Sequence, residues 1–136
     1  MLKLYIQKAS ELEKNIKVTA HSSGKLGFSE SAAKKLDLAN KKSLIIATNE
    51  DEEDGDLYMW PSQGETEEAF KVCRAGEYYY LNTKLLLEKL KIDYTNKDMI
   101  TIFDIIDFKY EGNNIYKLLK RVQPRTKTKK ADASDN

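Results

Sequence analysis

The sequence is poor in the residue types on which most catalytic and metal sites depend. Its 136 residues include one cysteine, Cys73, and one histidine, His21. A single cysteine cannot close an internal disulfide, and one cysteine with one histidine cannot supply the ligands of a structural zinc site. No Ser-His-Asp arrangement or multi-histidine metal site can be assembled either. We therefore expect a protein that is not an enzyme and that holds no metal ion and no cofactor.

Long apolar runs are also absent. No stretch approaches the roughly 18 consecutive apolar residues that span a bilayer, and the opening residues lack the apolar core and cleavage site of a secretion signal. We therefore expect a cytoplasmic location and no membrane partner. The length fits one domain, and a content of 40% hydrophobic and 33% charged residues is compatible with a folded core.

The net charge of +1 hides a strong segregation of charge. Residues 1–48 hold nine basic and four acidic residues, residues 49–70 hold nine acidic residues and no basic one, and residues 71–136 hold fourteen basic and nine acidic residues. The acidic run at residues 50–56 lacks the ligand spacing of a calcium loop and is interpreted as a solvated hairpin turn. Weak cation binding, or competition with nucleic acid for the basic residues, are the alternatives for this run.

One order of elements is predicted twice along the chain: two short strands, a short helix and two more strands. The first series is expected at residues 16–18, 25–29, 32–38, 43–48 and 56–60, and the second at residues 70–72, 78–81, 85–92, 98–103 and 114–118. The two helices end in similar sequences, Leu36-Asp37-Leu38 and Leu90-Lys91-Ile92. The pattern favours an internal duplication.

A unit of about 45 residues is too small to bury a core alone, so two units must share one. The predicted fold class is α+β and mostly β: duplicated ββαββ units form one pseudo-two-fold β-barrel with two short helices. The expected parts are an N-terminal segment (1–15), a first repeat (16–61), an acidic surface linker (62–69), a second repeat (70–122) and a disordered basic tail (123–136). With two copies in one chain, either a monomer or a homodimer is compatible with the sequence.

The first copy resembles the AbrB/SpoVT/MazE-like swapped-hairpin domains, and the duplication resembles the tandem MraZ proteins. The resemblance rests on the turn and strand at residues 24–29, the helix ending at residues 35–38 and the strand at residues 41–46. Lys25 stands where the family usually has arginine, and Ser29 stands where it usually has proline. The resemblance implies a small regulator or antitoxin-like protein that binds double-stranded DNA.

The basic residues are the predicted nucleic-acid contacts, because lysine and arginine bind phosphates with little dependence on sequence. The candidates are Lys17, Lys25, Lys34 and Lys35 in the first copy, Arg74 in the second, and Arg125, Lys127, Lys129 and Lys130 in the tail. Lysine offers only a point charge, whereas arginine usually reads guanine, and the chain has three arginines. We therefore expect low sequence specificity.

The tyrosine run offers a different reading. Tyr78 and Tyr80 should share one face of a strand while Tyr79 points to the other. An exposed pair could stack on the bases of a single-stranded nucleic acid, whereas core packing of two of the three tyrosines is the structural alternative. A protein-interaction or structural module without a nucleic-acid role remains a third reading. His21 is expected in an exposed turn, Cys73 in a buried strand position, and Gly24 and Gly27 at a turn and a bulge.

Overall fold

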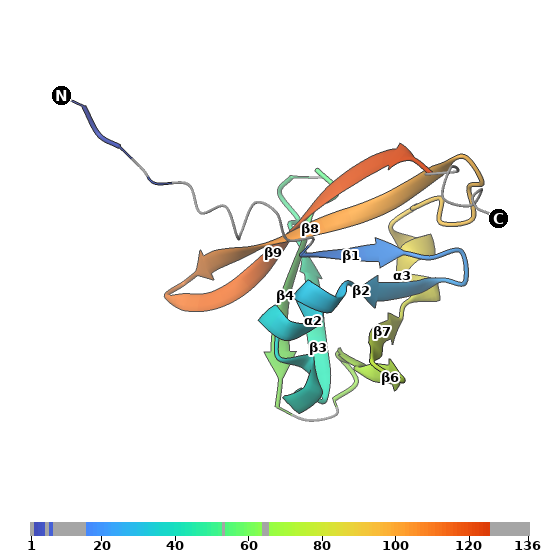
Figure 1. The fold of residues 1–136 in the computed structure, drawn as a ribbon, viewed down its shortest axis with the longest axis horizontal. Coiled ribbons are helices and arrows are strands. Elements are labelled where there is room, and N and C mark those ends of the chain that lie inside the picture. Colours follow the sequence, from blue (N-terminus) through green and yellow to red (C-terminus); the bar gives the residue numbers. More distant parts are fainter. Residues whose placement is uncertain (1, 5, 7–15, 53, 64–65, 126–136) are drawn as a thin grey trace.

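The protein is mostly β with two short helices, as the sequence predicts (Figure 1). The computed structural model describes residues 2–4, 6, 16–52, 54–63 and 66–125. The strands are β1 (Lys17–Ala20), β2 (Lys25–Phe28), β3 (Ser43–Thr48), β4 (Leu57–Ser62), β5 (Ala69–Lys71), β6 (Cys73–Ala75), β7 (Tyr78–Asn82), β8 (Met99–Tyr110) and β9 (Asn113–Pro124). The helices are α2 (Glu30–Lys35) and α3 (Lys84–Lys89), and a single 3₁₀ turn, η1 (Leu38–Asn40), follows α2. None of the helices in these residues has the length and apolar character needed to cross a membrane.

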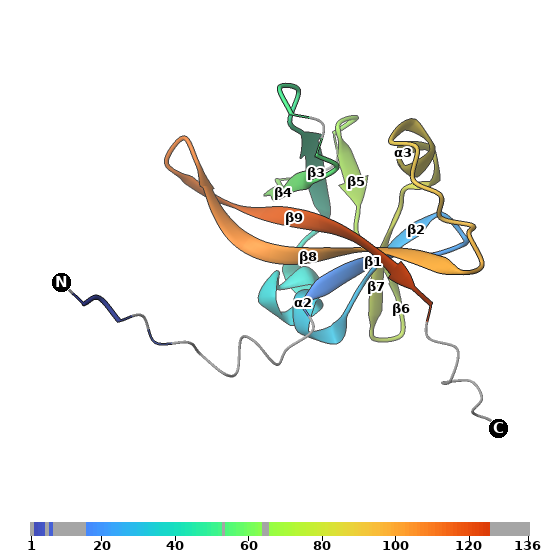
Figure 2. The same cartoon turned by 90° about the horizontal axis from the view of Figure 1, so that it is seen from above.

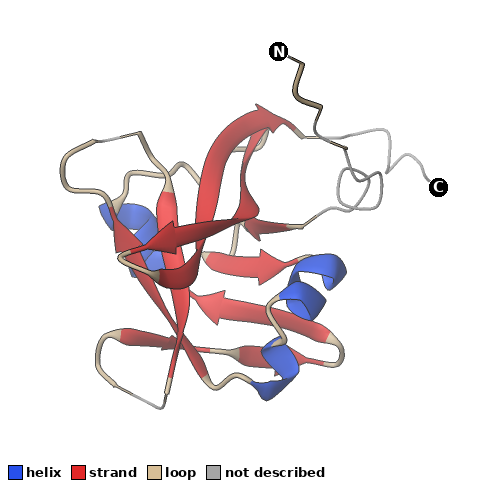
Figure 3. Ribbon diagram, turned by 90° about the vertical axis from the view of Figure 1, so that its left-hand side faces the viewer, coloured by secondary structure: helices blue, strands red, loops and turns tan. Residues whose placement is uncertain are grey.

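All nine strands belong to one antiparallel sheet that is nearly closed into a barrel (Figure 3). The strand order is β5-β3-β4-β9-β8-β1-β2-β7-β6. The two outermost strands, β5 and β6, are consecutive in the chain and separated only by Val72. The two ends of the sheet therefore meet at one place, which leaves little open edge.

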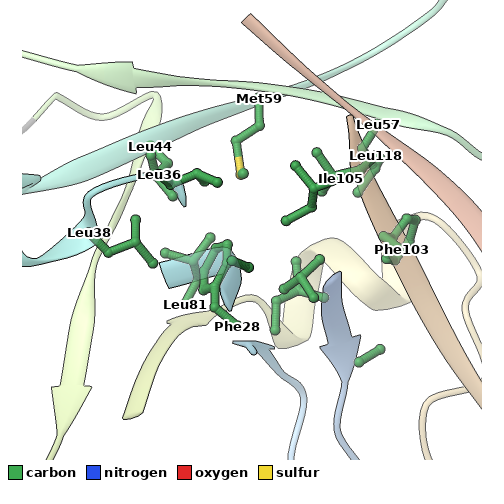
Figure 4. Packing of buried hydrophobic residues seen from close by; sticks show 14 of the residues in the cluster. Phe28, Leu36, Leu38, Leu44, Leu57, Met59, Leu81, Phe103, Ile105 and Leu118 are labelled. Atoms are coloured by element: carbon green, nitrogen blue, oxygen red, sulfur yellow. The ribbon is translucent and has the colours of Figure 1, made fainter. Parts of the chain in front are cut away.

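The core lies inside this barrel and is lined by alternate residues of the strands (Figure 4). Phe103 of β8 and Leu81 of β7 are completely buried there. The buried cluster consists of Val18, Ala20, Leu26, Phe28, Ala32, Leu36, Leu38, Leu44, Leu57, Met59, Leu81, Leu87, Ile92, Phe103, Ile105 and Leu118. Both halves of the chain contribute, so neither half has a core of its own.

The two helices end in the same way. The residue after each C-cap adopts a left-handed conformation: φ is 54° at Asp37 and 59° at Lys91. Leu36 and Leu38 flank Asp37, as Leu90 and Ile92 flank Lys91, and three of these four apolar side chains are buried. The similar helix endings seen in the sequence thus share one backbone geometry.

The last two strands are much longer than predicted. The expected strands at residues 98–103 and 114–118 are parts of a twelve-pair ladder between β8 and β9, so β9 also includes Gln123 and Pro124 of the predicted tail. Polar residues interrupt the apolar pattern, but Asp104 accepts two hydrogen bonds, of 2.6 and 3.2 Å, from Arg121, which lies diagonally across from it on the neighbouring strand. The far end of this ladder projects from the barrel as a two-stranded ribbon (Figure 2).

The left-handed position at Lys91 gives a direct test of the helix ending. Lys91→Gly is expected to raise the free energy of unfolding by about 1 kcal/mol, because glycine adopts this conformation without a Cβ clash. Lys89→Gly, at the exposed last position of α3, is expected to lower it by about 1 kcal/mol. Urea unfolding of both variants measures the difference. Destabilisation by both substitutions would contradict the strained geometry at Lys91.

Candidate nucleic-acid interface

The pairing of β2 with β7 brings a basic strand and a tyrosine strand together. Leu26 pairs with Leu81, and both side chains point into the core. The neighbouring pair, Gly27 and Tyr80, therefore lies on the outer surface of the sheet. Lys25, two residues before Gly27, lies on the same outer surface.

Tyr78 and Tyr80 lie side by side on this surface. Their ring centroids are 5.7 Å apart and the ring planes differ by 22°. Tyr79 points to the opposite side and packs against the core, so the core-packing alternative applies to one of the three tyrosines. The Tyr78 side of this pair is open to solvent, with 38% of the residue exposed.

Gly27 has no side chain, and Tyr78 occupies the space that a Cβ atom would fill. We call this space the seat of Tyr78. A Cβ atom at position 27 would overlap Tyr78 Oη and come within 2.5 Å of His21 Nε2. The strand is paired regularly on both sides here, so Gly27 is not the predicted bulge residue. Its missing side chain instead lets two polar rings lie over the sheet. Gly24 does occupy the predicted turn, with φ of 91°.

His21 belongs to the same surface and is half-buried, where the sequence predicted an exposed turn residue. Its ring approaches Tyr78 edge-on with 6.1 Å between centroids. Burial lowers the pKa of His21, and the positive charges of Arg125 and Lys25 lower it further. The imidazole is consequently neutral at pH 7.

Two cations flank this histidine without forming an ion pair in the described part of the chain. Lys25 Nζ lies 4.4 Å from the centroid of the Tyr80 ring, which is a cation–π contact. Arg125 follows β9, and its Nε donates a hydrogen bond of 2.8 Å to the carbonyl oxygen of Asn96. We call His21, Lys25, Tyr78, Tyr80 and Arg125 the tyrosine face. It combines aromatic surface with two positive charges that form no ion pair among the described residues.

The other predicted phosphate contacts are dispersed. Lys17 lies on the outer surface of β1, next to β2. On α2, Lys34 forms an ion pair of 3.5 Å with Glu30, and Lys35 forms one of 3.1 Å with Asp107. Lys127, Lys129 and Lys130 lie outside the described residues.

Arg74 does not join the tyrosine face. It pairs with Tyr79 across β6 and β7, and its guanidinium carbon lies 5.4 Å from the centroid of the Tyr79 ring. Arg74 therefore shares the side of the sheet opposite Tyr80. Cys73, predicted to be buried, is half-buried opposite Tyr80, and its sulfur lies 3.5 Å from Asn82 Nδ2.

Sequence reasoning missed His21 as a member of the face. The alternation of β1 contained the signal, because Val18 and Ala20 point inward and the next odd-numbered position is 21. The role of Gly27 could not be predicted from the sequence in the same way. It depends on the contact with Tyr78, which belongs to the neighbouring strand β7.

The acidic run forms the hairpin loop between β3 and β4, as predicted. A pocket of about 500 Å³ lies between this loop and the end of α3, and its charged lining residues are Glu52, Asp54, Asp56, Lys89, Lys91 and Lys120. Asp56 Oδ1 accepts a hydrogen bond of 2.8 Å from the backbone N–H of Lys120. In the described ranges no three His, Cys, Asp or Glu side chains are grouped as a metal site would require.

The lowered pKa of His21 predicts a pH dependence of stability. The folded state disfavours the proton, so this contribution is present above the unfolded value of 6.5 and is lost as the pH falls through it towards the folded pKa. We expect the free energy of unfolding to fall more between pH 7.5 and 5 in the wild type than in His21→Gln. Urea unfolding at the two pH values measures this. An equal fall in both proteins would exclude His21 as a source.

No family model matches this chain, and neither the curated proteins nor the solved structures contain a match. The likeness to swapped-hairpin domains therefore depends on residues and element order alone.

Proposed function

We propose that the protein binds single-stranded nucleic acid through the tyrosine face. The observation that carries the proposal is the stack on one outer surface: Lys25 lies over Tyr80, and Tyr78 lies beside Tyr80. Aromatic rings accept any base by stacking, and nearby cations hold the backbone phosphates. Sequence specificity is expected to be low, because stacking and phosphate contacts do not read base edges.

The chemistry of the face supports this function. Gly27 lets Tyr78 lie against the sheet, so a base can approach from the solvent side. Lys25 and Arg125 are free of carboxylate partners within the described structure and are available to phosphates. Lys127, Lys129 and Lys130 lie within five residues of Arg125 in the sequence. Each phosphate contact adds salt-dependent affinity.

We also propose that the fold arose by duplication of one ββαββ unit with pseudo-two-fold symmetry. When β5 and β6 together are taken as the counterpart of β1, exchanging the two halves leaves every strand pairing in place. The hairpins β1·β2 and β3·β4 correspond to β6·β7 and β8·β9, and β1·β8 corresponds to β5·β3. The pairings β2·β7 and β4·β9 correspond to themselves and lie on the axis. This interleaving is what the resemblance to tandem swapped-hairpin proteins implies.

Double-stranded DNA is the second candidate ligand, in the role of an AbrB-like regulator. Lys17 and Lys25 belong to the hairpin β1·β2, whose turn carries the resemblance, and β2 lies on the proposed axis. Lys34 and Lys35 on α2 engage carboxylates, and Arg74 lies on the other side of the sheet from Tyr80. The predicted duplex contacts are therefore less concentrated than the stacking residues, which favours the single strand.

Fluorescence anisotropy of labelled single-stranded and duplex oligonucleotides over a salt series tests the proposal. Tyr78→Ala with Tyr80→Ala is expected to weaken single-strand binding by about tenfold or more, since base stacking contributes about 1–3 kcal/mol per base. Lys25→Ala should weaken binding and reduce the salt slope by about 0.7. Lys34→Ala is the control, because Lys34 is paired with Glu30 on α2, and it should change little.

The outcomes separate the candidates. Duplex binding that survives loss of both tyrosines would replace the single-strand proposal with the regulator reading. Absence of binding to either oligonucleotide at low salt would remove nucleic acid as the ligand and favour a protein-interaction or structural role.

The seat at Gly27 gives a second test. Gly27→Ala should displace Tyr78 and His21 and weaken single-strand binding several-fold, because the added Cβ occupies their place. In a Tyr78→Ala background the same substitution should have a smaller effect, since the tyrosine ring is already absent and only His21 is left to be displaced. A double-mutant cycle by anisotropy measures the coupling. Additive losses would show that Gly27 acts elsewhere.

A further inference from the structure

Among the residues that the structure describes, no strand pairs with the β8 edge of the projecting part of the β8–β9 ladder. We call residues 106–115 the arm. β1 pairs with β8 only as far as Asp104, and the N–H of Ile105 donates a last hydrogen bond of 3.0 Å to Ile16. Beyond Ile105, in the residues that the structure describes, β8 pairs with β9 alone. Isolated two-stranded ribbons are marginally stable, and an open edge is a template for another strand.

The backbone groups on this edge can be assigned from the register. The N–H of Ile105 points towards β1, so the odd-numbered residues of β8 direct N–H and C=O to that side. Further along the arm, Asp107 and Lys109 therefore present their backbone groups to the open edge. Glu111, the next odd residue, already belongs to the turn with φ of 50°.

Asp107 and Lys109 give this edge a self-complementary pattern of charge, in which Asp107 also forms the ion pair with Lys35 of its own copy. Two copies of the edge that meet antiparallel, with a two-fold axis at Phe108, place Asp107 opposite the second copy's Lys109 and Lys109 opposite the second copy's Asp107. Each of these residues then exchanges backbone hydrogen bonds with its partner. Sliding either strand by two residues opposes Asp107 to Asp107 or Lys109 to Lys109. One register is thus favoured over both of its neighbours.

The apolar residues on the other side of the strand follow the same symmetry. Ile106 and Tyr110 are 41% and 54% exposed, and Phe108 lies between them on the same side. The same register sets Ile106 opposite the second copy's Tyr110, and Phe108 opposite the second copy's Phe108. Cross-strand pairs of aromatic and β-branched residues stabilise a sheet.

We propose that two copies of this chain associate by antiparallel pairing of the β8 edges of their arms. The occupant of the open edge is a second copy because the pattern of charge and apolar side chains matches itself through a two-fold axis, the commonest symmetry of protein dimers. The pairing is independent of the tyrosine face and does not rest on nucleic-acid binding. It joins the two arms into a four-stranded ribbon.

The experiment is sedimentation equilibrium of the full chain and of three charge variants. Wild type should dimerise with concentration. Lys109→Asp should raise the dimer dissociation constant about fivefold or more, because it opposes two aspartates twice. The double variant Asp107→Lys/Lys109→Asp, made together with Lys35→Asp so that the ion pair between positions 35 and 107 is kept within each copy, restores opposite charges between the copies and should return the constant to near the wild-type value. Lys97→Asp, an exposed charge reversal outside the arm, is the matched control and should have no effect.

Several results would overturn the proposal. Dimers that are insensitive to Lys109→Asp, or that the double variant does not rescue, would place the interface elsewhere. A chain that stays monomeric at millimolar concentration would exclude the pairing. In that case, hydrogen exchange showing protected amides at Asp107 and Lys109 would identify another segment of the same chain as the occupant.

Discussion

The pairing of β2 with β7 is the constraint on which the rest of the molecule depends. Leu26 and Leu81 meet there, are almost completely excluded from solvent, and hold the first half of the chain to the second. Because side chains alternate across a strand, burying these two leucines fixes Lys25, Gly27, Tyr78 and Tyr80 on the outer surface. A slip of one residue would bury the tyrosines and expose the core, so the fold and the candidate site share one register.

The two halves contribute different chemistry to this shared surface. The first half supplies Lys25 and the glycine seat, and the second supplies Tyr78 and Tyr80. A symmetric pair of identical units would present the same residues twice. Divergence of the two proposed copies instead places cation and aromatic ring in contact, at 4.4 Å between Lys25 and Tyr80. The candidate interface therefore needs both proposed copies, because neither copy supplies all of its residues.

The sequence was sufficient for features that depend on local patterns. Alternation predicted the two faces of the tyrosine strand, and the similar sequences of the two helix endings correspond to one left-handed backbone geometry at Asp37 and Lys91. Features that depend on partners across the sheet were missed. The length of β8 is an example, because Asp104 breaks the apolar pattern and its hydrogen bonds to Arg121 of β9 appear only in the folded sheet. The seat at Gly27 is another, since its meaning comes from Tyr78 on a different strand.

The β8–β9 ladder connects the two proposed surfaces of the molecule. Arg125 of the tyrosine face follows the end of β9, whereas the arm lies at the beginning of that strand. Roughly ten residues separate them, and at about 3.3 Å per residue two copies joined at their arms would hold their tyrosine faces on the order of 60 Å apart. A single-stranded chain long enough to reach both faces would bind the pair far more tightly than one face, because the second contact becomes intramolecular. A stiff duplex would have to match that spacing, whereas a flexible single strand would adjust to it.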